Sequence, residues 1–143
     1  MREILFRGKR LDNGEWIYGY YAAFGGKNNL HRVIYTGKFL ALPVGEGFAP
    51  EFYYVDSETV GQFTGLTDKN GKKIFEGDIV KEEDVVHNGE IQIPGHIFSV
   101  VMRKGCWCVI PIHDTDEWDF LNSYLHFLEV IGNIHDNPEL LEG

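Results

Sequence analysis

Closely spaced glycine turns constrain the fold of this chain more than any other feature of its sequence. Five dipeptides that end in glycine lie between apolar or alternating stretches: Asn13-Gly14, Gly25-Gly26, Asn70-Gly71, Asn88-Gly89 and Lys104-Gly105. Asn-Gly favours the type I′ turn, because both central residues of that turn take positive φ, and the turn connects antiparallel strands. The sequence therefore predicts a series of short β-hairpins.

The alternating stretches between these turns give the expected strands. Residues 3–9 are expected to pair with residues 15–23, where Trp16, Tyr18 and Tyr20 alternate along one face. Further strands are expected at residues 30–35, 52–55, 59–64, 78–83, 91–93, 96–103, 106–112 and 128–134, with the Gly/Pro-rich residues 36–50 as a long loop. The prediction is a mainly β fold, in which N-terminal antiparallel hairpins are joined to an SH3-like barrel or roll.

One helix is expected, over residues 115–125. Trp118, Leu121 and Leu125 recur at helical spacing, and Thr115 is a residue type that caps helix N-termini. The length of 143 residues suits one compact domain or two small modules that share a core. We expect a single unit, residues 1–143, with a soft subdivision into residues 1–60 and 61–143.

The net charge of −9 lies entirely in the second half of the chain. Residues 72–143 hold five Lys/Arg and fourteen Asp/Glu, whereas residues 1–71 hold eight of each. An acidic half repels DNA and acidic membranes, so duplex nucleic acid is not an expected partner. The basic residues that could bind a single strand, next to the rings of Trp16 and Tyr18, are Arg2, Arg7, Lys9, Arg10 and Arg32.

The sequence also predicts a cytoplasmic protein. The first residues contain no apolar segment of the kind found in signal peptides, and no apolar run reaches the length of a membrane span. Cys106 and Cys108 are separated only by Trp107, so a disulfide between them would be strained. We expect two reduced thiols.

The densest group of possible metal ligands is His113, Asp114 and Asp116, followed by Glu117 and Asp119. A carboxylate–imidazole site for a divalent cation is one interpretation, and acids that decorate a helix N-terminus are the other, favoured one. No phosphate-binding loop and no Gly-x-Ser-x-Gly motif occurs in the sequence. The sequence therefore predicts no catalytic constellation and no cofactor, and a metal-dependent hydrolase that uses His113 is the least favoured hypothesis.

Two segments of the chain carry a family resemblance. They are the central segment, residues 58–81, and the C-terminal segment, residues 132–141, in which Asn137 is expected to cap a helical turn that begins at Pro138. With Phe6-Arg-Gly8 and Trp16-Ile-Tyr-Gly19, they resemble the YopX family, small proteins found mainly in bacteriophages and prophages. The resemblance implies a known kind of fold and no established activity, and it leaves residues 83–128 unmatched.

The residues that carry this signature are those that turns and caps require: Gly61, Gly65, Asp68, Gly71, Gly77, Asp78, Gly132, Asn133, Asn137 and Pro138. We favour the interpretation of the signature as a turn framework, and a binding surface is the alternative. Aromatic residues are the better candidates for contact with a partner, because tyrosine and tryptophan favour interfaces. They are Trp16, Tyr18, Tyr20 and the consecutive Phe52, Tyr53 and Tyr54.

These observations predict a non-enzymatic phage or prophage accessory protein that acts through protein–protein contacts or self-association, as a homo-oligomer. An acidic β-module can bind a basic protein surface, and exposed strands and aromatic patches favour association. The alternative is a nucleic-acid-binding SH3-like module.

Overall fold

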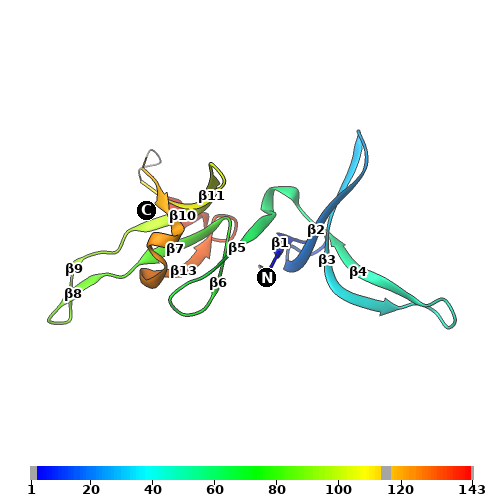
Figure 1. The fold of residues 1–143 in the computed structure, drawn as a ribbon, viewed down its shortest axis with the longest axis horizontal. Coiled ribbons are helices and arrows are strands. Elements are labelled where there is room, and N and C mark those ends of the chain that lie inside the picture. The colour runs from blue at the N-terminus through cyan, green and yellow to red at the C-terminus, as the bar shows by residue number, and fades with distance from the viewer. Residues whose placement is uncertain (1–2, 114–116, 143) are drawn as a thin grey trace. The chain divides into compact units, whose positions relative to one another are not determined.

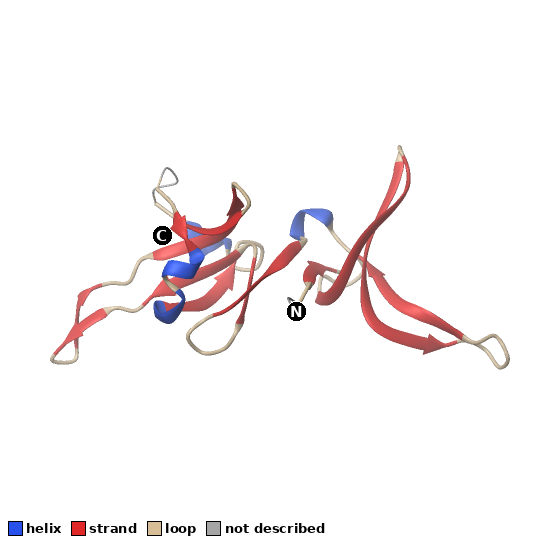
Figure 2. Ribbon diagram, in the orientation of Figure 1, coloured by secondary structure: helices blue, strands red, loops and turns tan. Residues whose placement is uncertain are grey.

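The structure is a computed structural model that describes residues 3–113 and 117–142. It divides the chain into two compact units, which we call the N-terminal unit (Met1–Phe63) and the C-terminal unit (Thr64–Gly143) (Figure 1). Strands dominate both units, and the strand pairs are antiparallel (Figure 2). The prediction of a mainly β, antiparallel fold is therefore confirmed.

Four strands build the sheet of the N-terminal unit, in the order β4-β3-β2-β1. They are β1 (Phe6–Lys9), β2 (Trp16–Gly26), β3 (Asn29–Ala41) and β4 (Phe48–Tyr54), and the 3₁₀ turn η1 (Ser57–Thr59) follows. The predicted first hairpin is present, with Lys9 opposite Trp16 and Phe6 opposite Gly19. Strand β5 (Gly61–Thr67) begins in this unit, where Gln62 pairs with Phe6, and continues into the C-terminal unit.

The prediction of a loop over residues 36–50 is wrong for most of that segment. Strand β3 runs on to Ala41 past a bulge, and β4 begins at Phe48, so only a tight turn separates them. In this turn the Leu42 N–H donates to the Gly47 carbonyl at 2.9 Å. The Gly and Pro residues there supply a bulge and a turn instead of a loop, because Gly37, Gly45 and Gly47 take positive φ.

The N-terminal unit has a small core around Gly8. Ile34 is fully buried, and it closes with Val55 and Val60 over Gly8, where a Cβ would lie 3.2–3.3 Å from each of them. Gly8 therefore provides the space into which these three side chains pack.

The C-terminal unit is built on a five-stranded sheet with the order β12-β11-β10-β7-β13. Its strands are β7 (Asp78–Glu82), β10 (Ile97–Arg103), β11 (Cys106–Pro111), β12 (Asp119–Phe120) and β13 (Leu128–Asn133). Strand β6 (Lys73–Phe75) lies next to β5, and β8 (Val85–His87) with β9 (Glu90–Ile93) forms a separate hairpin. The 3₁₀ turns are η2 (Leu121–Ser123), η3 (Leu125–Phe127) and η4 (Pro138–Leu141).

The main hydrophobic core lies in this second unit. Seven buried side chains form it: Ile74, Val80, Phe98, Val100, Val109, Leu121 and Leu128. They come from strands β6, β7, β10, β11 and β13 and from the turn η2, so residues far apart in the sequence meet in one core. Within residues 3–113 and 117–142, the structure has no helix that is long and apolar enough to cross a membrane.

The prediction of a helix over residues 115–125 is wrong for the residues that the structure describes, 117–125. Asp119 and Phe120 are extended and pair with β11, and the chain then continues in the short turns η2 and η3. The helical spacing of apolar residues has another explanation, because a 3₁₀ turn is enough to place Leu121 fully inside the core. Strand pairing and core packing outweigh the weak helical propensity of so short a segment.

The SH3-like barrel is not found as a closed barrel in the part of the chain that the structure describes. Strands β12 and β13 end the five-stranded sheet on its two sides, and the sheet stays open. Pro138 does begin a helical turn, but the Asn137 side chain does not cap it. The Asn137 Oδ1 atom instead accepts from the Asn133 N–H at 3.2 Å.

We expect Gly19→Ala to destabilise the N-terminal unit by more than about 1 kcal/mol, because a Cβ on Gly19 would lie 1.9 Å from the Tyr35 carbonyl oxygen. Gly26→Ala in the same strand is the matched control, since its Cβ would meet nothing within 4 Å. Urea titrations followed by circular dichroism measure both variants. Equal free energies of unfolding for the two would contradict this account of β2.

Candidate functional site

Rings from three neighbouring strands lie on one side of the N-terminal sheet. Tyr20 of β2 is directly opposite Tyr35 of β3, and Tyr35 is directly opposite Phe52 of β4. Opposed residues in an antiparallel sheet point to the same side, and so do residues two apart along a strand. We call this surface the aromatic face, and it comprises Trp16, Tyr18, Tyr20, Phe24, His31, Tyr35, Phe52 and Tyr54.

The rings of the aromatic face contact one another in sequence. The ring centroids of Tyr35 and Phe52 are 5.3 Å apart, and those of Phe52 and Tyr54 are 6.0 Å apart in an edge-on arrangement. His31 continues the series, 5.7 Å from Tyr54 and 5.3 Å from Phe24. These distances are typical of favourable aromatic pairs, so the rings form a connected surface.

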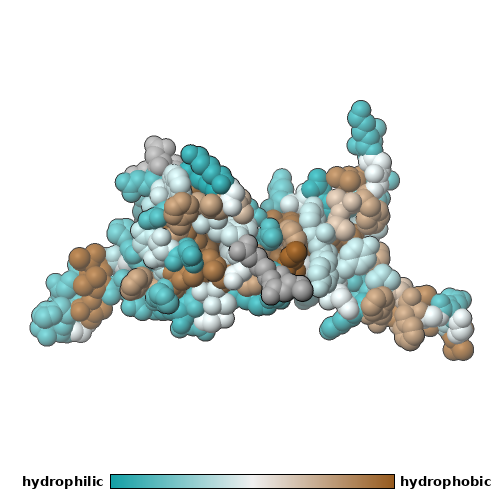
Figure 3. All heavy atoms as spheres, viewed as in Figure 1, coloured by the Kyte–Doolittle hydropathy of each residue, from teal (hydrophilic) through white to brown (hydrophobic). Residues whose placement is uncertain are grey.

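Several of these rings are nevertheless open to solvent. Tyr20 is 61% exposed and Phe52 is 38% exposed, and Tyr18, Phe24 and Tyr54 lie between these values. Apolar side chains also cover the outer part of the β3–β4 hairpin, where Phe39, Leu40 and Phe48 are exposed (Figure 3). The N-terminal unit therefore presents a large apolar and aromatic surface.

Of the six residues expected to contact a partner, Tyr53 lies apart. It is on the opposite side of β4 from Phe52 and Tyr54, and the Arg10 guanidinium lies 3.8 Å from its ring centroid. The Tyr53 hydroxyl donates to Glu51 at 2.6 Å, and this hydrogen bond raises the pKa of Tyr53 and lowers the pKa of Glu51. Alternation along the strand thus makes Tyr53 part of a local polar network and leaves its two neighbours on the aromatic face.

The basic residues expected to bind nucleic acid divide between the two sides of the sheet. Arg7 and Lys9 both lie over the Trp16 ring, at 4.7 and 5.5 Å from its centroid. Arg10 instead pairs with Asp12 at 2.5 Å. Arg32 donates to the Tyr21 hydroxyl at 3.1 Å, and Arg2 lies outside the described residues. Of the four that the structure describes, Arg7 and Lys9 join the aromatic face.

Among the signature residues, Asp68 connects a turn to a distant strand. Its Oδ1 atom accepts from the N–H groups of Asn70 and Lys72, each at 2.9 Å, and its Oδ2 atom accepts from the Val130 N–H at 2.9 Å. Burial by itself would raise the pKa of this carboxyl, which is 6% exposed, but the three backbone donors outweigh burial and lower the pKa. Asp68 thus ties the Asn70-Gly71 turn to β13.

The C-terminal signature forms a second polar anchor. Asn133 Oδ1 accepts from the N–H groups of His135 and Asp136, at 3.0 and 2.9 Å. Gly132 leaves space for the Asn137 side chain, because a Cβ on Gly132 would lie 2.4 Å from Asn137 Oδ1. This part of the signature therefore organises the turn that follows β13.

The remaining signature residues lie in strands and turns. Gly65, Gly71 and Gly77 take positive φ, and Gly61 pairs with Arg7 at the start of β5. Asp78 is buried, and its Oδ2 atom accepts from the Phe75 N–H at 2.7 Å. Each of these contacts shapes the backbone locally.

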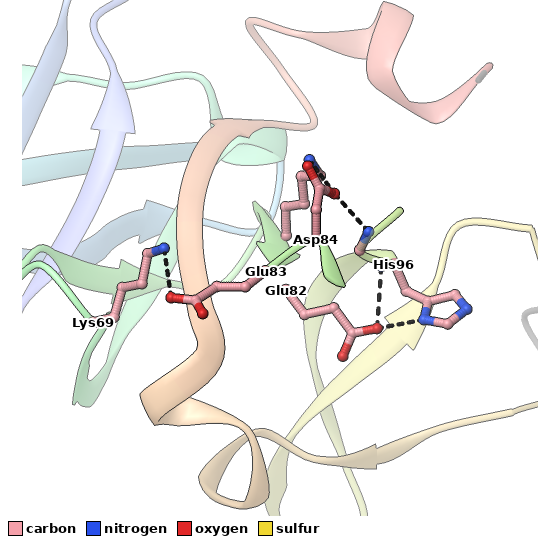
Figure 4. Close-up of polar contacts among 7 residues, drawn as sticks. Lys69, Glu82, Glu83, Asp84 and His96 are labelled. Carbon is pink, nitrogen blue, oxygen red and sulfur yellow. Dashed lines mark hydrogen bonds and ion pairs between the residues drawn. The ribbon is translucent and has the colours of Figure 1, made fainter. Parts of the chain in front are cut away.

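Charged residues cluster where the β8–β9 hairpin leaves the sheet (Figure 4). Asp84 accepts from the Gly95 N–H at 2.7 Å and pairs with Lys81 at 3.0 Å. Both contacts lower the pKa of Asp84, and the hydrogen bond from Gly95 has the larger effect. Glu83 pairs with Lys69 at 3.0 Å, and Glu82 contacts the His96 ring. Every acid of this cluster thus has a partner within the chain, which is typical of structural ion pairs.

Of the candidate metal ligands His113, Asp114 and Asp116, the structure describes His113. His113 is exposed in a turn, whereas Asp114 and Asp116 lie outside the described residues. Within the described ranges, no three His, Cys, Asp or Glu side chains are grouped so that they could hold a metal ion.

Comparisons with known proteins give one family and one fold. A family model described as "YopX protein" matches residues 5–142. No curated protein matches the chain. The chain is similar to the solved structure titled "Crystal structure of protein EF1440 from Enterococcus faecalis", with 24% sequence identity, 99% of each chain covered and a TM-score of 0.58. At this identity the likeness concerns the fold alone.

We expect Asp68→Asn to lower the free energy of unfolding by about 1–3 kcal/mol at pH 7, because one oxygen that accepts a backbone N–H becomes an amide donor. The folded pKa of Asp68 lies below that of the unfolded chain, about 3.9. The stability that its carboxylate contributes is therefore complete above that pH and is lost as the pH falls through the folded pKa. Urea titrations at pH values from 7 down to 3 should find that the difference in free energy of unfolding between wild type and variant becomes smaller as the pH falls.

The control for this prediction is Asp12→Asn. The pKa of the exposed Asp12 carboxyl is also lowered, by its hydrogen bond with Arg10, but solvent screens that pair. A loss of stability in Asp68→Asn no larger than in Asp12→Asn, or a gap that does not change with pH, would refute the proposed anchor.

Proposed function

This chain belongs to the YopX family, and we propose that it is a non-enzymatic phage or prophage accessory protein that associates with a second copy of itself through the aromatic face. The observation that carries the proposal is the connected and exposed row of rings across β2, β3 and β4. The proposal rests on the contact area that these rings supply, so it includes no catalytic step and no cofactor.

The balance of burial in the N-terminal unit supports association. Among the described residues of this unit, four hydrophobic side chains are buried and thirteen large ones are exposed. In the C-terminal unit the corresponding numbers are eleven and ten. A monomeric soluble protein rarely leaves such extended apolar surface uncovered, so the aromatic face is the part of this unit that gains most from a partner.

The distribution of charge favours a second copy as the partner. The N-terminal unit holds seven Lys/Arg and seven Asp/Glu, whereas the C-terminal unit holds six and fifteen. Two copies can therefore bring their N-terminal units together without net repulsion. A twofold contact places the same patch on both sides, so each contact between a ring of one copy and a ring of the other is formed twice.

Side chains, not strand edges, are expected to form this contact. Strand β4 ends the sheet of the N-terminal unit, but Pro50 in its middle has no N–H to donate to a neighbouring strand. Tyrosine and phenylalanine on the face can bury their rings while the tyrosine hydroxyls remain hydrated at the rim.

Analytical ultracentrifugation over a range of protein concentrations tests the proposal. We expect the wild type to form dimers or higher oligomers. Replacing two exposed rings, Tyr20→Ser with Phe52→Ser, should raise the dissociation constant at least about tenfold, because buried rings dominate the energetics of interfaces.

The matched control replaces two exposed apolar residues of the other unit, Val86→Ser with Ile91→Ser, and it should leave the dissociation constant unchanged. A wild type that remains monomeric at about 100 µM, near the dissociation constants of weak complexes, would refute the proposal. So would an equal effect of the two double variants.

A second function, single-strand nucleic-acid binding, is favoured by one observation. Arg7 and Lys9 lie over the Trp16 ring on the same side of the sheet as the exposed Tyr18. Positive charge beside stacking rings is the arrangement that binds single strands without sequence preference. The net charge of −9 works against duplex binding.

Fluorescence anisotropy with a labelled thymidine oligonucleotide at two salt concentrations tests this second function. Lys9→Gln should weaken binding and reduce the slope of log K against log salt by about 0.7, since one phosphate contact is lost. Lys27→Gln, in the β2–β3 turn, is the control and should bind like wild type. No salt-dependent binding at micromolar protein would exclude this function.

A further inference from the structure

A pocket of about 330 Å³ opens on the C-terminal unit beside β10, β11 and β12. Three rings and two carboxylates line it, those of Phe98, Trp118, Tyr124, Glu117 and Asp119. A ligand pocket of this size is at the small end of the usual range, so it suits one side chain or one small ion instead of a large cofactor.

The rings of the pocket are held in place by the fold. Phe98 comes from the core strand β10 and is 7% exposed, and its ring centroid lies 5.8 Å from that of Tyr124. Trp118 packs edge-on against Phe120 at 5.4 Å and remains 38% exposed. Ring faces carry negative potential, and a positively charged group placed over them is stabilised.

The carboxylates add charge at the same place. Asp119 Oδ2 accepts from the Tyr124 hydroxyl at 3.2 Å, and Asp119 Oδ1 accepts from the Phe120 N–H at 2.7 Å. Burial raises the pKa of Tyr124, and its hydrogen bond to Asp119 raises it further. Glu117 is exposed at the pocket, and no Lys, Arg or His is among the described residues that line it.

We propose that this pocket binds the guanidinium or ammonium group of a basic side chain on a partner protein. Aromatic faces combined with carboxylates attract an organic cation, and a planar guanidinium can stack on a ring while it pairs with an acid. The excess of acid in the C-terminal unit, fifteen Asp/Glu against six Lys/Arg, draws a basic protein surface toward the pocket. The pocket lies within the C-terminal unit, so the proposal does not depend on self-association through the aromatic face.

Nuclear magnetic resonance of the full chain tests the pocket, with the indole N–H signal of Trp118 as the readout. The variant Trp118→Phe identifies this signal among the three tryptophans of the chain. N-acetyl-arginine amide is the probe, and the corresponding citrulline amide is its neutral control of similar shape. We expect a saturable shift of the Trp118 signal with the arginine compound, at a dissociation constant of the order of a millimolar, and no shift with the citrulline compound.

Glu117→Gln tests the role of charge without changing a residue that packs in the fold. It should raise the dissociation constant several-fold, whereas Glu90→Gln, a change at an exposed residue of β9, should not. A Trp118 signal that does not respond to the arginine compound, that responds equally to citrulline, or that responds in the same way in Glu117→Gln would overturn the proposal.

Two further probes decide where the cation comes from. A peptide that contains the same arginine between neutral residues should bind at least as tightly as the amide if the ligand is a protein side chain. Tetramethylammonium chloride that binds more tightly than the peptide would assign the pocket to a free quaternary ammonium and overturn the protein partner. Repeating the titration in Tyr20→Ser with Phe52→Ser should give the same shift, whatever the oligomeric state of that variant.

Discussion

A β-strand sends successive side chains to opposite sides of its sheet, and the N-terminal unit covers the two sides unequally. On the aromatic face Val33 is fully buried, but several rings stay exposed. On the side opposite the aromatic face, Ile34 packs with Val55 and Val60 over Gly8. On the other side, the alternation of β2, β3 and β4 brings rings to the surface, among them Tyr20 and Phe52. The proposed self-association depends on this unequal covering, because a second copy is what would remove the second side from water.

The C-terminal unit buries a larger share of its apolar side chains within its own fold. Its core draws apolar side chains from five strands and a 3₁₀ turn, and its buried polar residues accept backbone donors. Asp68 and Asn133 use their oxygens to hold turns against β13, which is where the family signature lies. The proposed cation pocket instead lies within residues 83–128, the segment without a signature motif, where surfaces can vary without loss of the turn framework.

The separation of charge gives the two units different roles in these proposals. The N-terminal unit is neutral overall, so copies of it can meet through their rings without net repulsion. The C-terminal unit carries the whole net charge of −9, which disfavours contact with its own copy and favours a basic partner. One chain would thus combine the aromatic face, through which it associates with its own copy, with a pocket that binds a basic partner protein.

The sequence by itself determined the fold class, the first hairpin and the strands that follow glycine turns, because these depend on local conformational preference and on alternation over a few residues. It also identified the aromatic residues of β2 and β4 as surface candidates. It grouped Tyr53 with its two neighbours, however, whereas alternation along β4 places Tyr53 on the opposite side, where its ring contacts the Arg10 guanidinium. It also predicted a loop where β3 continues through a bulge.

Only the tertiary structure decided the conformation of residues 117–125. Their apolar spacing suits a helix, yet the pairing of Asp119 and Phe120 with β11 and the burial of Leu121 select a strand and 3₁₀ turns. That choice brings Trp118 and Asp119 to one pocket with Phe98 and Tyr124. The sequence determined which residues are aromatic or acidic, and long-range strand pairing and core packing, which no local pattern encodes, decided which of them meet.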